Sequence, residues 1–185
     1  MRFFESFYDE IGARLRDADP TLLDIICKTF VHAQQCNRKV ILGGNGGSAM
    51  IASHVSVDLT KAAHVRSVCF NEPDLITCFA NDYGYENWLA RAIESYGDAG
   101  DVAVLISSSG RSPNIVNAAR CAKDCGLTVV TLSGFDAANP LRTLGDQNLW
   151  VNSRSYNLVE TVHQTWLLAC VDRIVFQLNG GEKRR

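Results

Sequence analysis

The sequence predicts an α/β protein in which a five-stranded parallel sheet is covered by helices on both faces. Two observations support this fold class. Short apolar segments alternate with helical patterns along the chain, as buried parallel strands joined by crossover helices do. With 185 residues, of which 46% are apolar and 21% charged, the chain is long enough for one domain with one buried core.

Five segments are strand candidates because they are short, mostly apolar and bounded by polar or glycine-containing stretches. They are residues 40–42, 65–70, 102–106, 127–132 and 148–151. Right-handed crossovers between parallel strands bring the strand-to-helix loops to one edge of the sheet, where such folds bind ligands. Functional residues are therefore expected in those loops.

Two helices are expected before the first strand. Apolar residues recur at helical spacing within 3–15 and within 22–31, and Pro20 separates the two runs. We predict that residues 1–36 form an amino-terminal helical segment that serves oligomerisation, because its first helix is strongly apolar. Residues 37–179 then form the main domain.

Two of the later helices have recognisable ends. Ser112 suits the N-cap of one helix, Pro113 its first position, and Gly126 the residue past its end. The last helix is expected to run from about Leu158 to Leu178.

Charge and hydropathy exclude several classes of partner. Lysine and arginine number 18 and aspartate and glutamate 20, so the net charge of -2 lacks the basic excess that nucleic-acid binding needs. No apolar run approaches the roughly 20 residues of a membrane span, and the first residues lack the apolar core of a signal peptide. We expect a cytoplasmic protein with no nucleic-acid or membrane partner, and any acidic ligand must be small.

The seven cysteines do not form a recognisable metal motif. No Cys-x-x-Cys pair occurs, and Cys121 and Cys125 have no second pair nearby to complete a zinc site. Most of the cysteines lie in apolar segments, so they are expected to be buried, reduced thiols that behave as small hydrophobic residues.

Two strand-to-helix loops have the composition of a phosphate site. Residues 44–48 read Gly-Asn-Gly-Gly-Ser, and residues 107–112 read Ser-Ser-Ser-Gly-Arg-Ser. Glycines allow close backbone approach, amides at a helix N-terminus point toward an anion, and serine hydroxyls add neutral donors. Together the loops predict a phosphate site without lysine, although each loop alone could be only a tight turn with helix caps.

A dinucleotide site is a competing interpretation. Gly44, Gly46 and Ala49 satisfy a relaxed glycine fingerprint, and Glu72 lies near the end of the next strand candidate, where a ribose-binding acid would stand. This interpretation leaves the serine-rich loop unexplained. The glycine-lysine motif of nucleotide triphosphatases is absent from the sequence.

Several motifs, taken together and in order, resemble the sugar isomerase (SIS) domain of the phosphoheptose isomerase group. They are residues 44–49, the helix that contains His54 and Asp58, residues 80–85, 100–102, 106–114 and 131–134. The resemblance covers about residues 38–170 and implies a flavodoxin-like three-layer sandwich with phosphosugar-binding function. It further implies an aldose–ketose isomerase that converts sedoheptulose 7-phosphate to D-glycero-D-manno-heptose 7-phosphate, as a homotetramer with active sites between subunits.

The resemblance also assigns substrate-binding residues. The serine loop would hold the phosphate, the glycine loop would contact the substrate, and a further pair would contact the sugar. These residues are Ser107, Ser108, Ser109 and Ser112, then Asn45, Gly46, Gly47 and Ser48, then Asn81 and Asp82.

In that family an active-site zinc is held by a helical histidine and glutamate four residues apart, and by a glutamine and a histidine eight residues apart on the last helix. Here His54 and Asp58 match the first pair, Glu160 replaces the glutamine, and Leu168 stands at the second histidine. The resemblance therefore implies one zinc ion per subunit on His54, Asp58 and Glu160. An ordinary polar helix face is the alternative for His54 and Asp58.

Isomerisation through an enediol needs a base, an acid and stabilisation of developing charge, which a divalent metal can supply. Asp58 and Glu160 are the catalytic candidates. His163 is no substitute for the missing histidine, because five residues of helix rotate it by about 140° from position 168, and a buried or capping role is expected for it. The loss at Leu168 favours the alternative of a non-catalytic phosphosugar-binding protein that acts as a regulator or scaffold.

Overall fold

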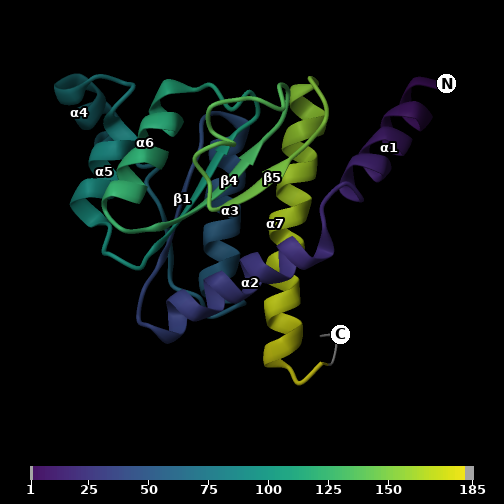
Figure 1. Ribbon diagram of the computed structural model, residues 1–185, viewed down its shortest axis with the longest axis horizontal. Coiled ribbons are helices and arrows are strands. Elements are labelled where there is room, and N and C mark those ends of the chain that lie inside the picture. The colour runs from purple at the N-terminus through teal and green to yellow at the C-terminus, as the bar shows by residue number, and fades with distance from the viewer. Residues whose placement is uncertain (1, 182–185) are drawn as a thin grey trace.

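A parallel sheet in the order β2-β1-β3-β4-β5 forms the centre of the protein, whose computed structural model describes residues 2–181 (Figure 1). The strands are β1 (Val40–Gly43), β2 (Ser67–Cys69), β3 (Val102–Ser107), β4 (Thr128–Ser133) and β5 (Gln147–Trp150). Every residue of β1 and β3 is buried, as expected for central strands covered on both faces. The predicted fold class is confirmed, and β2 is shorter than the predicted segment 65–70.

Helices cover both faces of the sheet. They are α1 (Arg2–Leu15), α2 (Pro20–Gln35), α3 (Gly47–Lys61), α4 (Pro73–Tyr83), α5 (Trp88–Tyr96), α6 (Pro113–Asp124) and α7 (Tyr156–Leu178). Buried side chains of α2, α3 and α7 share one core with one face of the sheet, and those of α5 and α6 share a second core with the other face. Because α2 lies in the first core, the amino-terminal helices pack directly on the domain. The division of the chain into residues 1–36 and 37–179 stays a prediction.

The strand order contains a topological switch point between β1 and β3. From β1 the chain adds β2 on one side, then returns and adds β3 on the other side. The loops that follow β1 and β3 therefore leave the sheet in opposite directions, and a crevice opens between them. This is the place where a ligand site is expected.

Helix α6 begins and ends as predicted, after Ser112 and before Gly126. Gly126 has a φ of +77°, and the amide of Leu127 donates to the carbonyl of Ala122 at 2.8 Å, which closes the helix with a left-handed turn. Ser112 is the N-cap residue, yet its hydroxyl makes no capping bond to the helix and instead contacts the hydroxyl of Ser107 at 3.1 Å. Ser112 is therefore the N-cap residue, as predicted, but its hydroxyl serves the loop and not the first turn of the helix.

The prediction that the cysteines are buried holds only in part. All seven are free thiols, as expected, but only Cys27 and Cys170 are buried. Cys36 and Cys78 are exposed, because Cys36 is the residue that ends α2 and Cys78 lies on α4, a helix without a single buried residue. The remaining three are partly buried.

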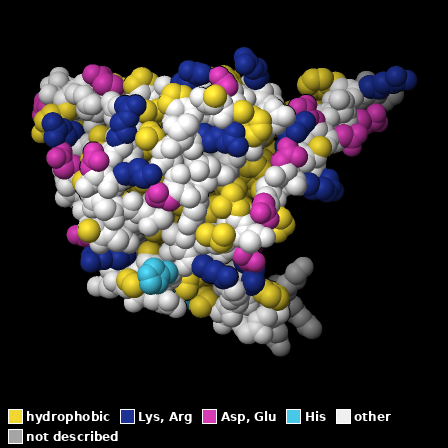
Figure 2. All heavy atoms as spheres, viewed as in Figure 1, with side chains coloured by type: hydrophobic (Ala, Val, Ile, Leu, Met, Phe, Trp, Pro, Cys, Tyr) yellow, Lys and Arg dark blue, Asp and Glu magenta, His cyan; other side chains and the backbone are white. Residues whose placement is uncertain are grey.

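Helix α1 extends away from the body of the domain (Figure 1) and has no buried residue. One side of it packs on the core through Phe7, Ile11 and Leu15, and the indole of Trp166 donates to the carbonyl of Leu15 at 3.0 Å. Figure 2 shows hydrophobic side chains on this helix and on the surface beside it. No helix within residues 2–181 is long and apolar enough to span a membrane.

Candidate active site at the carboxyl edge of the sheet

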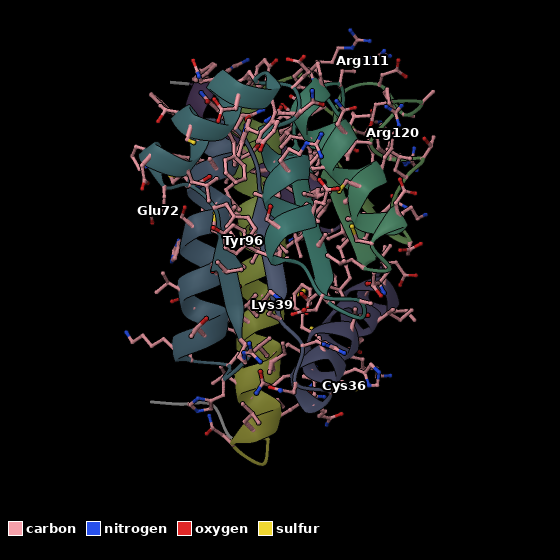
Figure 3. The ribbon with its side chains drawn as sticks, turned by 90° about the vertical axis from the view of Figure 1, so that its left-hand side faces the viewer. Cys36, Lys39, Glu72, Tyr96, Arg111 and Arg120 are labelled. Carbon is pink, nitrogen blue, oxygen red and sulfur yellow. The ribbon has the colours of Figure 1, made fainter. Side chains whose placement is uncertain are left out.

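The two loops predicted to bind phosphate meet in a hollow of about 100 Å³. In Figure 3, Arg111 marks this end of the molecule, and Lys39, which precedes β1, lies toward the other end. The hollow is lined by Asn45, Ser48, Ile106, Ser107, Ser108, Ser109, Ser112, Tyr156 and Glu160. The structure thus brings together the loops after β1 and β3 with two side chains of α7.

The serine hydroxyls of the loop 107–112 differ in whether they have a hydrogen-bond partner. Ser107 and Ser112 bond to each other, and the Ser109 hydroxyl accepts from the amide of Arg111 at 3.2 Å. Ser108 is only 4% exposed, and its hydroxyl has no hydrogen-bond partner within the described residues. A buried polar group without a partner is costly, so Ser108 is suited to a ligand that bonds to it.

The glycine loop keeps its side of the hollow open. Gly46 has a φ of +54°, which favours glycine, and a methyl group at Gly44 would lie 2.6 Å from the backbone carbonyl carbon of Ser48. The helix α3 begins at Gly47, and Ser48 in its first turn lines the hollow. Two helix N-termini, those of α3 and α6, therefore favour an anion here without any lysine.

A reciprocal amide pair joins the two loops. The Asn45 amide nitrogen donates to the Asn114 oxygen at 2.9 Å, and the Asn114 nitrogen donates to the Asn45 oxygen at 2.8 Å. The Tyr85 hydroxyl also donates to the Asn45 oxygen, at 3.1 Å. Asn45 thus ties the loops together, in addition to lining the hollow. Sequence reasoning missed Asn114 and Tyr85 as site residues, although an asparagine in the first turn of α6 was a visible signal.

Helix α7 supplies the carboxylate of the hollow. The Glu160 carboxyl group lies directly against Gly47, and a methyl group at Gly47 would overlap it. Partial burial raises the pKa of Glu160 above its usual range, and the nearby Ser108 opposes that shift. Tyr156, one turn earlier on the same face of α7, forms a further wall and was missed by sequence reasoning, although its four-residue spacing from Glu160 was a signal.

His54 and Asp58 lie outside the hollow, along the seam between α3 and α7. The Nε2 atom of His54 is 3.3 Å from Oδ2 of Asp58, and the Nδ1 atom is 3.1 Å from Nε2 of Gln164. The side chains of His54 and Asp58 are 47% and 35% exposed. Gln164, which the sequence reasoning did not name, stands one turn after Glu160 on the same face of α7.

The expected metal set is only partly assembled. Two ligands of one tetrahedral zinc ion, each about 2.0–2.1 Å from it, lie about 3.3 Å apart, which matches the separation between His54 and Asp58. Glu160 is not part of this group. Within residues 2–181 no three His, Cys, Asp or Glu side chains are close enough to share a metal ion. The residues therefore fit two positions of a zinc site and not the expected three.

The structure does not bring Asn81 and Asp82 to the hollow. Both are exposed on α4, where the Asn81 amide donates to the Asp82 carboxylate at 2.9 Å. Helix α4 follows the edge strand β2, so these side chains project from the margin of the domain. Their contact with the sugar stays a prediction.

Comparison with known proteins identifies the family. The SIS domain family matches residues 5–134. A phosphoheptose isomerase of Halorhodospira halophila is 32% identical over 190 residues, which cover 97% of this chain and 96% of the relative. One from a Bradyrhizobium species is 36% identical over 146 residues, 75% of this chain and 72% of the relative. This chain belongs to the phosphoheptose isomerase family of SIS-domain proteins.

Solved structures of phosphoheptose isomerases share the fold along nearly the whole chain. That of the Francisella tularensis protein superposes with a TM-score of 0.86 at 26% identity and covers 95% of both chains. That of the Neisseria gonorrhoeae protein gives a TM-score of 0.85 at 25% identity and covers 94% of this chain and 97% of its own.

On the last helix of this phosphoheptose isomerase homologue, Leu168 stands where the resemblance places a histidine, and it is partly buried and packs on the core. His163 does not replace the missing histidine. It is fully buried, and its Nε2 atom bonds to the carbonyl of Ser133 at 3.0 Å, which confirms the predicted buried role. Its Nδ1 atom has no partner within the described chain, and burial lowers the pKa of His163 to about 4.

Replacing Ser108→Ala should weaken binding of a sugar phosphate about tenfold or more, because a hydrogen bond to a charged group contributes about 1.5–3 kcal/mol. Stability should change little, since this hydroxyl makes no hydrogen bond within residues 2–181. Titration calorimetry and urea denaturation measure the two effects. Ser56→Ala, which removes a remote hydroxyl bonded to Ser67 at 3.1 Å, is the control. Equal affinity of Ser108→Ala and wild type would contradict the assignment.

His163 should make stability fall in acid. The unfolded histidine takes up a proton below its ordinary pKa of about 6.5, whereas the folded one stays neutral down to a pKa of about 4. The unfolded state therefore binds more protons between these values, and stability declines as the pH falls through this window. In His163→Gln the decline should be smaller by up to about 3 kcal/mol in urea denaturation series. Identical slopes would show that His163 does not titrate this way.

Proposed function

We propose that this chain isomerises sedoheptulose 7-phosphate to D-glycero-D-manno-heptose 7-phosphate. The observation that supports it most directly is the hollow itself, in which two anion-binding loops face the carboxyl group of Glu160, whose pKa is raised. Relatives named phosphoheptose isomerase, at 32–36% identity, support the same substrate.

The phosphate group of the substrate occupies the serine loop in this proposal. Ser108 supplies an unpartnered hydroxyl, and the N-terminus of α6 supplies the favourable dipole. Arg111 does not neutralise the phosphate in the free protein, because its guanidinium is paired with Asp136 at 2.8 Å on the outer surface. Recognition by hydroxyls and amides requires the phosphate geometry, so an unphosphorylated heptulose binds poorly.

Proton transfer is assigned to the carboxylates of Glu160 and Asp58. A base removes the proton from C1 of the ketose while an acid protonates the C2 oxygen, which gives the enediol. Removal of the O1 proton and return of a proton to C2 then yield the aldose. Because burial raises the pKa of Glu160 above its ordinary value, this carboxyl group gives up its proton less readily than an exposed one and suits a group that both takes and returns a proton. Asp58 lies further along the α3–α7 seam. Of the oxygens on C1 and C2, it would exchange a proton with the one that Glu160 does not serve.

The proposal includes a zinc ion held by only two of the three expected ligands, His54 and Asp58. When bound, a divalent cation would polarise the carbonyl oxygen and stabilise the enediolate. Catalytic zinc sites usually have three protein ligands, and the described residues of one chain offer two in the right relation. Activity should therefore be measured with and without zinc.

Self-association is proposed from the exposed face of α1. Phe3, Phe4 and Tyr8 are 73%, 63% and 64% exposed on a helix that projects from the domain. Such a cluster of aromatic side chains is typical of a surface covered in an assembly. A second copy of this chain is the proposed partner, within a homotetramer, and a cytoplasmic location belongs to the same proposal.

Direct assay of product from sedoheptulose 7-phosphate, with and without zinc, tests the reaction. Wild type should turn over, and Asp58→Asn and Glu160→Gln should lower kcat by about 10²–10⁴ while phosphosugar binding remains. Asp172→Asn, an exposed carboxylate on the same helix as Glu160, is the control. Binding without any turnover of a panel of ketose and aldose phosphates would instead support the non-catalytic regulator or scaffold that Leu168 favours.

Deleting residues 1–18 should break the assembly and lower solubility, because it removes α1 and uncovers the core side chains beneath it. The triple variant Phe3→Ser, Phe4→Ser, Tyr8→Ser should dissociate the assembly without harming the fold, since it changes only exposed side chains. Light scattering gives the mass of each. A wild type that is already monomeric would refute the proposed interface.

A further inference from the structure

The loop that follows β4, residues 134–141, bonds to the serine loop at both of its ends. At the first end, the amide of Gly134 donates to the carbonyl of Ser108 at 2.9 Å. At the second end, the amide of Leu141 donates to the carbonyl of Gly110 at 3.1 Å. Two carbonyl oxygens of the serine loop are therefore directed toward the loop 134–141.

The direction of these carbonyls also sets the direction of the amides that follow them. In a trans peptide the carbonyl and the next N–H point in opposite directions, and every peptide bond within residues 2–181 is trans. The Ser108 carbonyl thus turns the Ser109 amide away from the loop 134–141, and the Gly110 carbonyl does the same for the Arg111 amide. A loop that binds an anion needs its amides free and its carbonyl oxygens turned aside.

The side chain of Asn139 fixes the shape of the loop after β4. Asn139 is fully buried, and its amide nitrogen lies 2.8 Å from the carbonyl oxygen of Asp136 and 3.3 Å from that of Gly134. The same nitrogen is 3.1 Å from the Ser133 hydroxyl. Its amide oxygen accepts from the backbone amide of Arg142 at 3.0 Å. Carbonyls can only accept and a backbone N–H can only donate, so these partners determine the orientation of the Asn139 amide.

Asn139 also contacts the serine loop directly. Gly110 has a φ of +63°, and a methyl group at this position would overlap the Asn139 side chain. The backbone of Gly110 therefore packs on the Asn139 amide, in addition to its bond with Leu141. Asn139 does not line the hollow itself, so any effect that it has on a ligand passes through the serine loop.

We propose that Asn139 is a positioning residue of the phosphate site. It holds the loop 134–141 in the shape that turns the carbonyls of Ser108 and Gly110 aside, and the amides of the serine loop are left for the phosphate. This role rests on the part of the proposed function that places a phosphate in the serine loop, and it does not depend on turnover.

Titration calorimetry of Asn139→Ala with sedoheptulose 7-phosphate tests this role. Affinity should fall about tenfold or more, because amides that face a charged group lose their orientation. Asn148→Ala is the matched control, since the Asn148 nitrogen likewise holds a loop by donating to the carbonyl of Gly145 at 2.9 Å, but at the opposite edge of the sheet. It should leave the affinity unchanged. Urea denaturation shows that both variants are folded during the titration. A folded Asn139→Ala with wild-type affinity would overturn the proposal.

Hydrogen exchange tests the same link in the wild type, without a variant that could fail to fold. Coupling is reciprocal, so a ligand whose site is positioned by these bonds must stabilise them in return. With saturating sedoheptulose 7-phosphate, exchange of the Gly134 and Leu141 amides should slow about fivefold more than exchange of a remote loop amide. The amide of Gly100, which donates to the carbonyl of Gly126 at 3.0 Å, is that control. Equal slowing at all three amides would overturn the proposal.

Kinetics separate this proposal from the proposed reaction. Asn139→Ala should raise KM about tenfold with little change in kcat, because the network holds the phosphate and not the groups assigned to proton transfer. A lower kcat at unchanged KM would overturn the positioning role. A wild type that binds the sugar phosphate without turnover would overturn only the isomerase function, and one that does not bind it would overturn both.

Discussion

Parallel pairing of β1 with β3 is the constraint on which the rest of the site depends. Their register places Gly43 beside Leu105, so the glycine loop and the serine loop leave the sheet next to each other although about sixty residues separate them in the sequence. The reciprocal bonds between Asn45 and Asn114 are possible only because of this register. Without them two mobile polar loops would have to be ordered by the ligand, at an entropic cost.

The third wall of the hollow comes from the packing of α7. Its buried side chains lie in the same core as those of α3, and this contact aims Glu160 at the glycine loop. Only a glycine at 47 leaves room for the carboxyl group there. The same enclosure that positions Glu160 also removes part of its hydration, which raises its pKa and gives a carboxyl group that can exchange protons closer to neutral pH. The packing of α7 thus accounts both for the position of Glu160 and for its raised pKa.

The last helix brings Gln164, and not Leu168, to the side chain of His54. Leu168 packs on the core and offers no polar atom to the seam, whereas Gln164, one turn earlier, bonds to the imidazole. Asp58 in place of a glutamate is shorter, yet it still reaches Nε2 of the histidine on its own helix. The site therefore holds a histidine, two carboxylates and an amide along one seam, with the anion-binding loops at its upper end.

The sequence by itself determined the strands, the parallel sheet and the two loops, because hydrophobic period, glycine and serine act locally and leave a readable pattern. It also identified Glu160 as a site residue through resemblance to the family. Only the tertiary structure decided that Asn45 is bonded to Asn114, that Asn81 and Asp82 face solvent, and that Gln164 touches His54. The bonds between Asn45 and Asn114 and between Gln164 and His54 join residues far apart in the chain. They depend on the pairing of β1 with β3 and on the packing of α7 against α3, which no local pattern encodes.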